Sequence, residues 1–283
     1  MKVAWIGTGV MGKPMALHLA NNGYEVQVYN RTFEKAQVME PKVKAFKDIQ
    51  SCVSDVDIVF SIVGYPNDVK ETYEEVMKHV KKGTILVDMT TSSPTLAIQL
   101  EKKAKVLGLS MLDAPVTGGD LGAINATLSI MVGGEEAIYQ KVLPLFNCMG
   151  KTITYMGDPG NGQHAKLANQ TAIAGAIAGV AEALAYAKTN HLDQQRMLQV
   201  ITGGSAQSWQ ATKNGPKMIG KDYAPGFFIK HFLKDLKLVL DEKKDLSLDV
   251  VETVARVYES LVQIGMHDFG TQAIIEYYLQ KLS

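Results

Sequence analysis

Cysteine is nearly absent from this sequence. Its 283 residues include only Cys52 and Cys148, without CxxC spacing or a neighbouring histidine cluster, which argues against a cysteine-based zinc site. The six histidines are dispersed and form no HExxH or comparable ligand pattern. No metal is therefore expected, and the two thiols are expected to be buried or incidental.

An excess of charge of one sign is missing as well. Lysine and arginine together number 29, as do aspartate and glutamate, so the formal net charge is zero. A broad basic field, which would attract phosphate backbones or anionic lipid headgroups, is excluded. Nucleic acid and membranes are therefore not expected as partners.

Long apolar runs are also scarce. The chain passes from Met1 and Lys2 into a short strand-like run without the successive regions of an export signal, which predicts a cytoplasmic protein. The most membrane-like stretch, residues 171–187, is mainly alanine and glycine, contains Glu182 and is barely long enough to span a membrane. A tightly packed helix of a soluble domain is the better interpretation.

Short β-branched runs alternate with helical patterns through the first half of the chain. This alternation predicts a parallel sheet with helices on both faces. Strands are predicted at residues 3–6, 25–29, 58–63, 84–88, 110–113, 128–132 and 152–155. Helices are predicted at residues 11–21, 67–80, 94–107 and 135–149.

The pattern changes after Gly157. Residues 158–162 (Asp-Pro-Gly-Asn-Gly) are a cluster of structure breakers, and nearly everything beyond them has helical spacing. The expected fold class is α/β, with a Rossmann-type doubly wound sheet in residues 1–161 and an all-helical domain in residues 162–283, joined by a long interdomain helix. Helices of the second half are predicted at residues 163–190, 193–201, 231–242, 248–264 and 271–282.

Three glycines follow the first strand and open the first helix. Gly7 would allow a tight turn, Gly9 would let a pyrophosphate approach the backbone, and Gly12 would let the helix pack closely on the sheet. The NH groups at the helix start would then face the phosphate charge. The loop predicts dinucleotide binding by Gly7, Gly9, Val10, Met11 and Gly12, and the alternative is an ordinary glycine-rich turn.

The end of the second strand indicates which nicotinamide cofactor binds. An NAD enzyme generally has a carboxylate here that bonds the ribose, whereas a 2′-phosphate is repelled by that charge and favours arginine. Asn30 brings no repulsion, Arg31 offers a forked donor to phosphate oxygens, and Thr32 adds a hydroxyl. These residues predict NADP(H). The alternative is that Arg31 is a solvated surface charge and Thr32 a helix N-cap.

A hydroxyl residue and two glycines lie beyond the strand at residues 110–113. Thr117, Gly118 and Gly119 would present bare NH groups, which suit a carboxylate. Taken alone, the stretch could equally be a glycine turn between strands.

Lys166 lies near the start of the long helix, with Asn169 and Gln170 on the same helical face. The neighbouring residues are alanine, leucine and small side chains, so a lysine that faced a cleft would lose solvation and have a lowered pKa. Such a lysine could donate and accept a proton near neutral pH. The alternative is a surface charge.

Lys234 and Asp235 stand within an aromatic and aliphatic pattern at residues 227–241. Considered alone, this stretch is an amphipathic helix with solvated charges.

Together these stretches resemble the β-hydroxyacid dehydrogenase family, which includes 3-hydroxyisobutyrate dehydrogenase, tartronate semialdehyde reductase and the glyoxylate or succinic semialdehyde reductases. The resemblance rests on four motifs in the family's order and spacing, across most of the chain. They are GTGVMGKPM at residues 7–15, DAPVTGG at 113–119, GNGQHAKLANQ at 160–170 and KDL at 234–236.

The resemblance implies roles for the residues in these motifs. Lys166 would be the catalytic acid and base, and Asn169 would orient the substrate. Thr117, Gly118 and Gly119 would hold the substrate carboxylate. The residues implied to line the cofactor are Val63, Gly64, Tyr65 and Thr91, with Lys234 near nicotinamide and substrate and Asp235 supporting the cleft.

Some positions depart from the family pattern. Thr117 replaces the more usual serine and adds a methyl group that could narrow the pocket. Gln170 stands where several relatives have a second asparagine, so the choice between Asn169 and Gln170 as the orienting amide stays open. The LANQ stretch is similar to tartronate semialdehyde reductases and Asn30-Arg31-Thr32 to NADPH-using aldehyde reductases, so the preferred substrate is open too.

The implied reaction is reversible hydride transfer between NADP(H) and a short β-hydroxy acid or its semialdehyde, with Lys166 exchanging the proton on the substrate oxygen. The apolar C-terminal helices and the resemblance predict a homodimer or homotetramer. One alternative is an imine reductase, against which Lys166 argues. Another is a non-catalytic NADP(H)-binding sensor.

Overall fold

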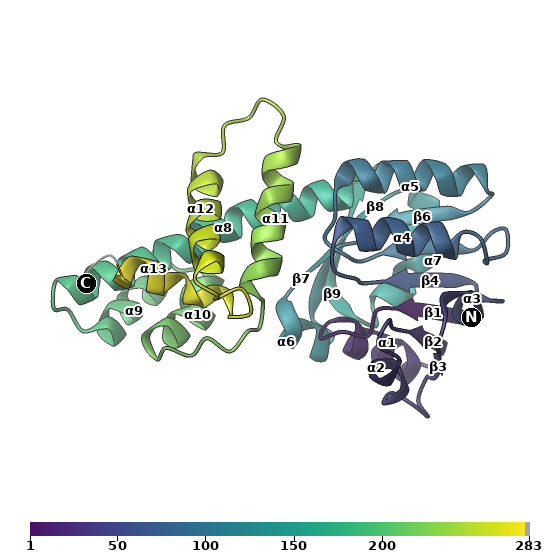
Figure 1. Ribbon diagram of the computed structural model, residues 1–283, viewed down its shortest axis with the longest axis horizontal. Coiled ribbons are helices and arrows are strands. Elements are labelled where there is room, and N and C mark those ends of the chain that lie inside the picture. The colour runs from purple at the N-terminus through teal and green to yellow at the C-terminus, as the bar shows by residue number, and fades with distance from the viewer. Residues whose placement is uncertain (281–283) are drawn as a thin grey trace. The chain divides into compact units, whose positions relative to one another are not determined.

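The computed structural model describes residues 1–280 and divides the chain into two compact units, Met1–Lys166 and Leu167–Ser283 (Figure 1). Each unit contains its own buried apolar core. The sequence predicts a boundary after residue 161. That position is the start of helix α8 (Asn161–Thr189), within which the first unit ends and the second begins.

A nine-stranded sheet forms the centre of the first unit. Its strand order is β3-β2-β1-β4-β5-β6-β8-β7, with β9 also paired to β8. The strands from β3 to β6 are parallel, and the chain order reverses between β1 and β4, the switch point of a doubly wound fold. The strands are β1 (Lys2–Ile6), β2 (Glu25–Tyr29), β3 (Lys44–Phe46), β4 (Ile58–Ser61), β5 (Ile85–Asp88), β6 (Ser110–Asp113), β7 (Val116–Thr117), β8 (Leu128–Gly133) and β9 (Gly150–Gly157).

The parallel arrangement indicated by the alternation does not extend beyond β6. Strand β8 is antiparallel to both β6 and β7. The connection from β7 to β8 holds only the short helix α6 (Gly119–Ile124), and a parallel return needs a longer crossover. The next connection contains helix α7 (Glu136–Phe146), and β9 accordingly lies parallel to β8.

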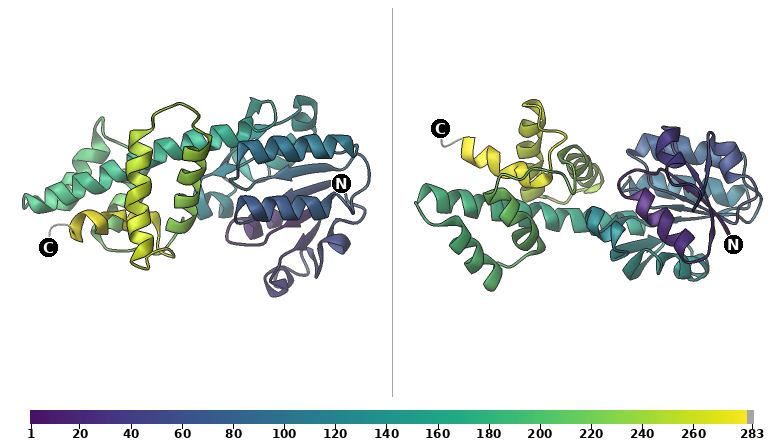
Figure 2. Two further views of the ribbon diagram at one scale, coloured as in Figure 1. Left: turned by 45° about the horizontal axis from the view of Figure 1, so that its top comes forward. Right: turned by 90° about the horizontal axis from the view of Figure 1, so that it is seen from below.

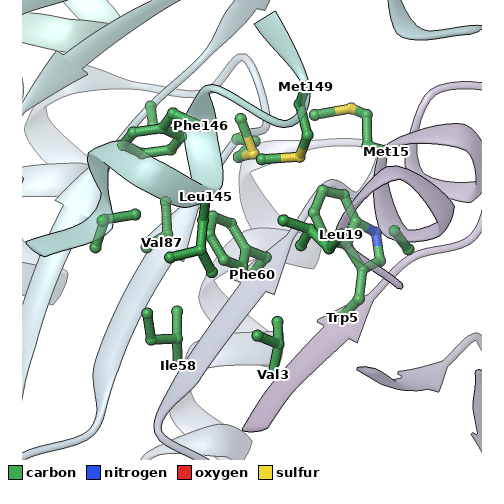
Figure 3. Packing of buried hydrophobic residues seen from close by; sticks show 14 of the residues in the cluster. Val3, Trp5, Met15, Leu19, Ile58, Phe60, Val87, Leu145, Phe146 and Met149 are labelled. Carbon is green, nitrogen blue, oxygen red and sulfur yellow. The ribbon is translucent and has the colours of Figure 1, made fainter. Parts of the chain in front are cut away.

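The period-two alternation of β1 divides its side chains between two cores. Val3 and Trp5 pack with residues of α1 and α7, and the Trp5 ring stacks on Phe60 with centroids 5.4 Å apart (Figure 3). Ala4 and Ile6 belong to the other core, which includes residues of α4 and α5. Helices therefore cover both faces of the sheet, as the alternation predicts. The remaining helices of this unit are α1 (Gly12–Asn21), α2 (Phe33–Gln37), α3 (Ile49–Val53), α4 (Pro66–Val76) and α5 (Pro94–Val106).

The second unit is helical, as predicted, and α8 enters it as one unbroken helix (Figure 2). By length and composition this helix could cross a membrane, but half of its most apolar 18-residue stretch is buried inside the protein, as in a core helix. In the same core Phe232 of α11 meets Tyr258 of α12 edge to face. The other helices are α9 (Gln194–Gly203), α10 (Trp209–Ile219), α11 (Ile229–Glu242), α12 (Asp249–Gln263), the 3₁₀ helix η1 (Thr271–Ala273) and α13 (Ile274–Gln280).

Several elements have no counterpart in the sequence prediction. Strands β3 and β7 and helices α2, α3 and α6 are too short to show a period. Helix α10 is longer, but Gly215 and Pro216 interrupt its pattern. The predicted helix at 271–282 is a 3₁₀ turn followed by α13, and residues 281 and 282 lie outside the described part of the chain.

Candidate cofactor and catalytic site

The predicted site residues of the first unit follow the carboxyl ends of neighbouring strands. The glycine loop follows β1, Val63 to Tyr65 follow β4, Thr91 follows β5, and Thr117 to Gly119 end β7 and begin α6. Ligands of doubly wound folds bind at this edge of the sheet, beside the switch point.

Two of the loop glycines are required by the protein itself. Gly7 has a φ of 94°, and a Cβ there would lie 2.2 Å from the Ile62 carbonyl oxygen. A Cβ on Gly12 would lie 1.9 Å from the carbonyl oxygen of Gly7 and 2.9 Å from Trp5 Nε1. Trp5 Nε1 donates a hydrogen bond to that same carbonyl at 3.0 Å. Gly7 and Gly12 therefore permit the tight turn and the close packing of α1.

Gly9 has a different environment. Its φ lies outside the left-handed region, and within residues 1–280 no atom other than those of Gly9 and its two chain neighbours lies within 4 Å of a Cβ built there. The adjacent Thr8 Oγ1 is buried and, within the described residues, has no hydrogen-bond partner. An open glycine beside an unsatisfied hydroxyl fits the approach of a dinucleotide pyrophosphate.

Among the residues after β2, Asn30 makes hydrogen bonds within the protein. Asn30 Oδ1 accepts a hydrogen bond from the Thr8 backbone NH at 3.1 Å, and Asn30 Nδ2 donates to the Thr32 carbonyl at 2.9 Å. Asn30 therefore ties the glycine loop to the end of β2. Thr32 occupies the N-cap position of α2 but makes no side-chain capping bond.

Arg31 is paired with a carboxylate that sequence reasoning missed. Its Nη1 lies 3.0 Å from Asp68 Oδ1, while 77% of the arginine side chain remains exposed. Asp68 Oδ2 also accepts a hydrogen bond from the Tyr65 NH at 2.9 Å, and a Cβ on Gly64 would lie 2.8 Å from the same oxygen. An acidic residue in the first turn after Pro66 is a capping signal, but sequence spacing alone does not indicate the pair with Arg31.

A buried polar network lies beneath the loops after β4 and β5. Asp88 Oδ1 accepts from the Thr90 NH at 3.1 Å and lies 3.0 Å from Ser61 Oγ, which is 2.9 Å from the Tyr73 hydroxyl. Thr90 Oγ1 accepts from the Val63 NH at 3.0 Å. Burial raises the pKa of Asp88 to about 6, although bonds from Thr90 and Ser61 favour its charged form. The network holds the predicted cofactor residue Val63 in place.

The start of α8 is anchored to the end of β6. Asp113 Oδ1 accepts from the Gly160 NH and Oδ2 from the Gln163 NH, each at 2.8 Å. Burial raises the pKa of Asp113 even though these backbone bonds oppose the shift. Gly162 permits the contact, because a Cβ there would lie 2.4 Å from the Asp113 carbonyl oxygen. Lys166 follows in the next turn, and only 5% of its surface is exposed.

Thr117, Gly118 and Gly119 form the turn from β7 into α6. Thr117 is half-buried, and the two glycines have φ values of 134° and 66°. Positive φ values at successive residues favour glycine, so the backbone conformation requires this pair whatever its ligand.

The remaining predicted residues belong to the second unit, where two hydrogen bonds and an ion pair connect them. Gln170 Nε2 donates to Asp235 Oδ2 at 2.7 Å, and Asn169 Nδ2 donates to Gln170 Oε1 at 3.0 Å. Lys234 Nζ lies 3.1 Å from Asp235 Oδ1, and only 1% of Asp235 is exposed. The solvated-charge interpretation of the segment is therefore wrong for Asp235. A buried carboxylate of this kind needs the ammonium and amide partners that it has here.

No cluster of three or more histidine, cysteine, aspartate or glutamate residues that could hold a metal occurs within residues 1–280.

Comparison with known proteins agrees with this organisation. Residues 2–157 match the model of the NAD-binding domain of 6-phosphogluconate dehydrogenase, and residues 160–278 match the NAD-binding model of NADP-dependent 3-hydroxyisobutyrate dehydrogenase. A probable 3-hydroxyisobutyrate dehydrogenase-like protein of Arabidopsis thaliana is 42% identical, over 97% of this chain and 84% of its own. The 2-hydroxy-3-oxopropionate reductase of Escherichia coli is 37% identical, over 89% and 88%.

Solved structures have the same fold over nearly their whole length. The Mycobacterium tuberculosis 3-hydroxyisobutyrate dehydrogenase, solved with L-serine, has a TM-score of 0.90 at 29% identity, covering 97% of this chain and 98% of its own. The protein Psf3, in complex with NADP⁺ and 2-OPP, has a TM-score of 0.89 at 25% identity, covering 99% and 100%. The chain therefore belongs to the β-hydroxyacid dehydrogenase family and is an NAD(P)-dependent oxidoreductase of the 3-hydroxyisobutyrate dehydrogenase type.

Proposed function

We propose that the protein reversibly transfers hydride between NADP(H) and a short β-hydroxy acid or the corresponding semialdehyde. The observation that carries the proposal is the buried Lys166, in the first turns of a helix whose start is anchored to the carboxyl edge of the sheet. The glycine loop that fits a dinucleotide belongs to the same edge.

The chain's own groups have distinct tasks in this proposal. When bound, the nicotinamide cofactor supplies or accepts the hydride. The backbone NH groups at Gly118 and Gly119, with the Thr117 hydroxyl, bind the substrate carboxylate. Lys166 donates a proton to the substrate oxygen during reduction and removes it during oxidation. Holding the carboxylate keeps the reacting carbon and its oxygen in one orientation.

The linked residues of the second unit have supporting tasks in the same proposal. Asn169 or Gln170 orients the substrate, and Lys234 binds near the nicotinamide and the substrate. Asp235 supports both tasks by holding the Gln170 amide and the Lys234 ammonium.

Arg31 and Asn30 support NADP(H) as the cofactor. Asn30 places no charge at the end of β2, and Arg31 is exposed and offers several donors to a phosphate. The related Psf3 was solved with NADP⁺. Asp68 opposes this preference, since its carboxylate already neutralises part of the Arg31 charge.

The catalytic role is tested with Lys166→Ala against glyoxylate, succinic semialdehyde, tartronate semialdehyde and methylmalonate semialdehyde with NADPH. We expect the wild type to oxidise NADPH with at least one of them, and kcat of the variant to fall about 10²- to 10⁴-fold, as loss of a general acid does. NADPH affinity, measured by fluorescence titration, should change little. Lys188→Ala, an exposed change in the last turn of α8, is the matched control. A wild type that binds NADPH and reduces none of the four would favour the sensor function instead.

The cofactor preference is tested by two variants at the Arg31–Asp68 pair. Arg31→Ala should weaken NADPH about tenfold or more and leave NADH nearly unchanged, because only the 2′-phosphate loses charge-assisted bonds. Asp68→Asn keeps an acceptor for the Tyr65 NH but removes the competing charge, so NADPH should bind a few-fold tighter. Equal effects of Arg31→Ala on both cofactors would reject NADP(H) as the preferred one.

A further inference from the structure

Gln163 is a buried polar residue to which the proposed reaction assigns no task. It lies in the first turn of α8, and its exposed fraction is 0%. Its Oε1 accepts a hydrogen bond from the Ser92 NH at 2.9 Å, and its Nε2 donates one to the Thr90 carbonyl at 2.7 Å. One side-chain amide thus bonds a backbone donor and a backbone acceptor of the same loop.

Few side chains can make this pair of bonds. A primary amide has a carbonyl acceptor and an NH₂ donor on one planar group, which matches the backbone NH of Ser92 and the backbone carbonyl of Thr90. An apolar residue would leave a buried NH and a buried carbonyl unsatisfied, and an asparagine would be one methylene too short. The backbone NH of Gln163 is also used, because it donates to Asp113.

Hydrogen bonds connect the loop that Gln163 bonds to residues proposed to line the cofactor. Thr90 bonds Asp88 through its NH and Val63 through its hydroxyl, and Thr91 stands between the two residues that Gln163 bonds. Gln163 therefore joins the first turn of α8 to the loops after β4 and β5. Lys166 is three residues further along the same helix, on the same face.

We propose that Gln163 is a positioning residue that sets the register of Lys166 against the cofactor-binding loops of the first unit. This inference rests on the proposed function, since it assumes that Lys166 exchanges the substrate proton. In this role Gln163 acts through its bonds to the loop and not by binding substrate or cofactor. Its effect is to hold the first helical turn at a constant place relative to Val63 and Thr91, so that hydride and proton transfer occur on the same bound molecule.

Gln163→Glu tests this role with a side chain of the same shape. Protonated, the new carboxyl accepts from the Ser92 NH and donates to the Thr90 carbonyl, as the amide does. Ionised, it turns a negative oxygen toward that carbonyl and loses the bond to it. Asp113, which accepts from the Gln163 NH, and Asp88, which accepts from the Thr90 NH, oppose the new charge, whereas Lys166 on the same helical face favours it. At high pH the variant should therefore lose kcat, and it should regain activity as pH falls. The pH profile of kcat relative to wild type shows this recovery.

The full experiment compares Gln163→Ala, Gln163→Glu, Lys166→Ala and His164→Ala, an exposed control in the same turn. Each full-length protein is assayed at saturating NADPH and semialdehyde, and its thermal midpoint and NADPH affinity are measured. We expect kcat of Gln163→Ala to fall about 10- to 100-fold, as loss of a group that orients an active residue does, and His164→Ala to stay within twofold. If Gln163→Ala does not fold, the recovery of Gln163→Glu at low pH carries the test.

The outcomes separate the inference from the proposed function. Turnover by Lys166→Ala at the wild-type rate would reject the proposed function itself. An inactive Lys166→Ala beside a Gln163→Ala with kcat within twofold of wild type would reject only the positioning role, even if Gln163→Ala melts earlier. The positioning role would also be rejected if the kcat of Gln163→Glu, divided by the wild-type kcat, did not change with pH.

Discussion

At the scale of single residues, the glycines of the first loop have different neighbours. Gly12 is enclosed by the Gly7 carbonyl and the Trp5 ring, whereas Gly9 borders open space. Within one glycine motif, Gly12 therefore meets a requirement of folding and Gly9 a requirement of ligand binding. The two requirements can be separated experimentally.

Replacing each glycine by alanine should separate folding from binding. Gly12→Ala should lower the free energy of unfolding by about 1–3 kcal/mol or more, since backbone and an indole must shift to admit the methyl group. Gly9→Ala should leave the thermal midpoint nearly unchanged and weaken NADPH several-fold, because its methyl group would occupy space left for the pyrophosphate. Urea denaturation and fluorescence titration measure the two effects. Unchanged NADPH affinity in Gly9→Ala would contradict dinucleotide binding at this loop.

Asp88 should make stability depend on pH. Its pKa is about 6 in the folded protein, above the value of about 3.9 in an unfolded chain. The folded state therefore holds the proton more tightly, and this stabilisation is complete below about pH 4 and is lost as pH rises through 6. The loss amounts to about 3 kcal/mol, since one pKa unit corresponds to ~1.4 kcal/mol.

Asp88→Asn, which is neutral at every pH, should remove this contribution. Its free energy of unfolding should fall less between pH 4 and pH 7 than that of wild type, as measured by urea denaturation at several pH values. Asp245→Asn, at an exposed position, is the control. Parallel curves for wild type and Asp88→Asn would show that Asp88 does not titrate in this range.

At the scale of elements, the start of α8 is held by a contact between distant parts of the chain. The Gly160 NH donates to Asp113, and Gly162 lets the backbone approach the same residue, since a Cβ on Gly162 would lie 2.4 Å from the Asp113 carbonyl oxygen and 2.6 Å from that of Met131. Gly162 is therefore required by packing against β6 and β8, whereas Gly160, with a φ of 89°, packs against Pro94 and Ile98 of α5. The same contact decides where Lys166 lies.

Gly162→Ala should disturb both stability and catalysis. The added methyl group would meet two backbone oxygens, which cannot rotate away as a side chain would, so the free energy of unfolding should fall by roughly 2 kcal/mol or more. The first turn of α8 should shift, and kcat should fall. Gly179→Ala is a suitable control, because a Cβ at that helical position has no described neighbour within 4 Å. A variant with wild-type stability would show that the start of α8 is loosely held.

At the scale of the whole molecule, the chain contains separate cores. The clusters on the two faces of the sheet include residues of the first unit only, and the cluster around Phe232 and Tyr258 includes residues of the second unit only. Tyr258 is fully buried, and its hydroxyl donates to the Thr271 carbonyl at 2.8 Å. We therefore expect a change at Tyr258 to act on the second core.

Tyr258→Phe should lower the free energy of unfolding of the second unit by about 1–2 kcal/mol, because the Thr271 carbonyl loses its donor. NADPH affinity should stay within about twofold of wild type, since the glycine loop and Arg31 belong to the first unit. Denaturation and fluorescence titration of one preparation measure both values. A tenfold loss of NADPH affinity would show that the second core controls the cofactor site.

The sequence by itself determined the fold class, the long helices and strands, and the family. These features depend on local periodicity and on motifs that lie close together in the chain. Asn30, Arg31, Asp88 and Gln163 acquire their partners only in the tertiary structure. Each bonds a residue far away in sequence, such as Asp68 for Arg31 and Thr90 for Gln163.

The antiparallel edge of the sheet and the short elements β3, β7, α2, α3 and α6 were likewise decided by tertiary structure. Segments of a few residues have too little local pattern to specify a conformation, so packing against neighbouring strands and helices selects it. The burial of polar side chains is also decided by the tertiary structure. Only the folded chain removes water from Asp88, Gln163 and Lys166, and a polar group without water needs partners within the protein.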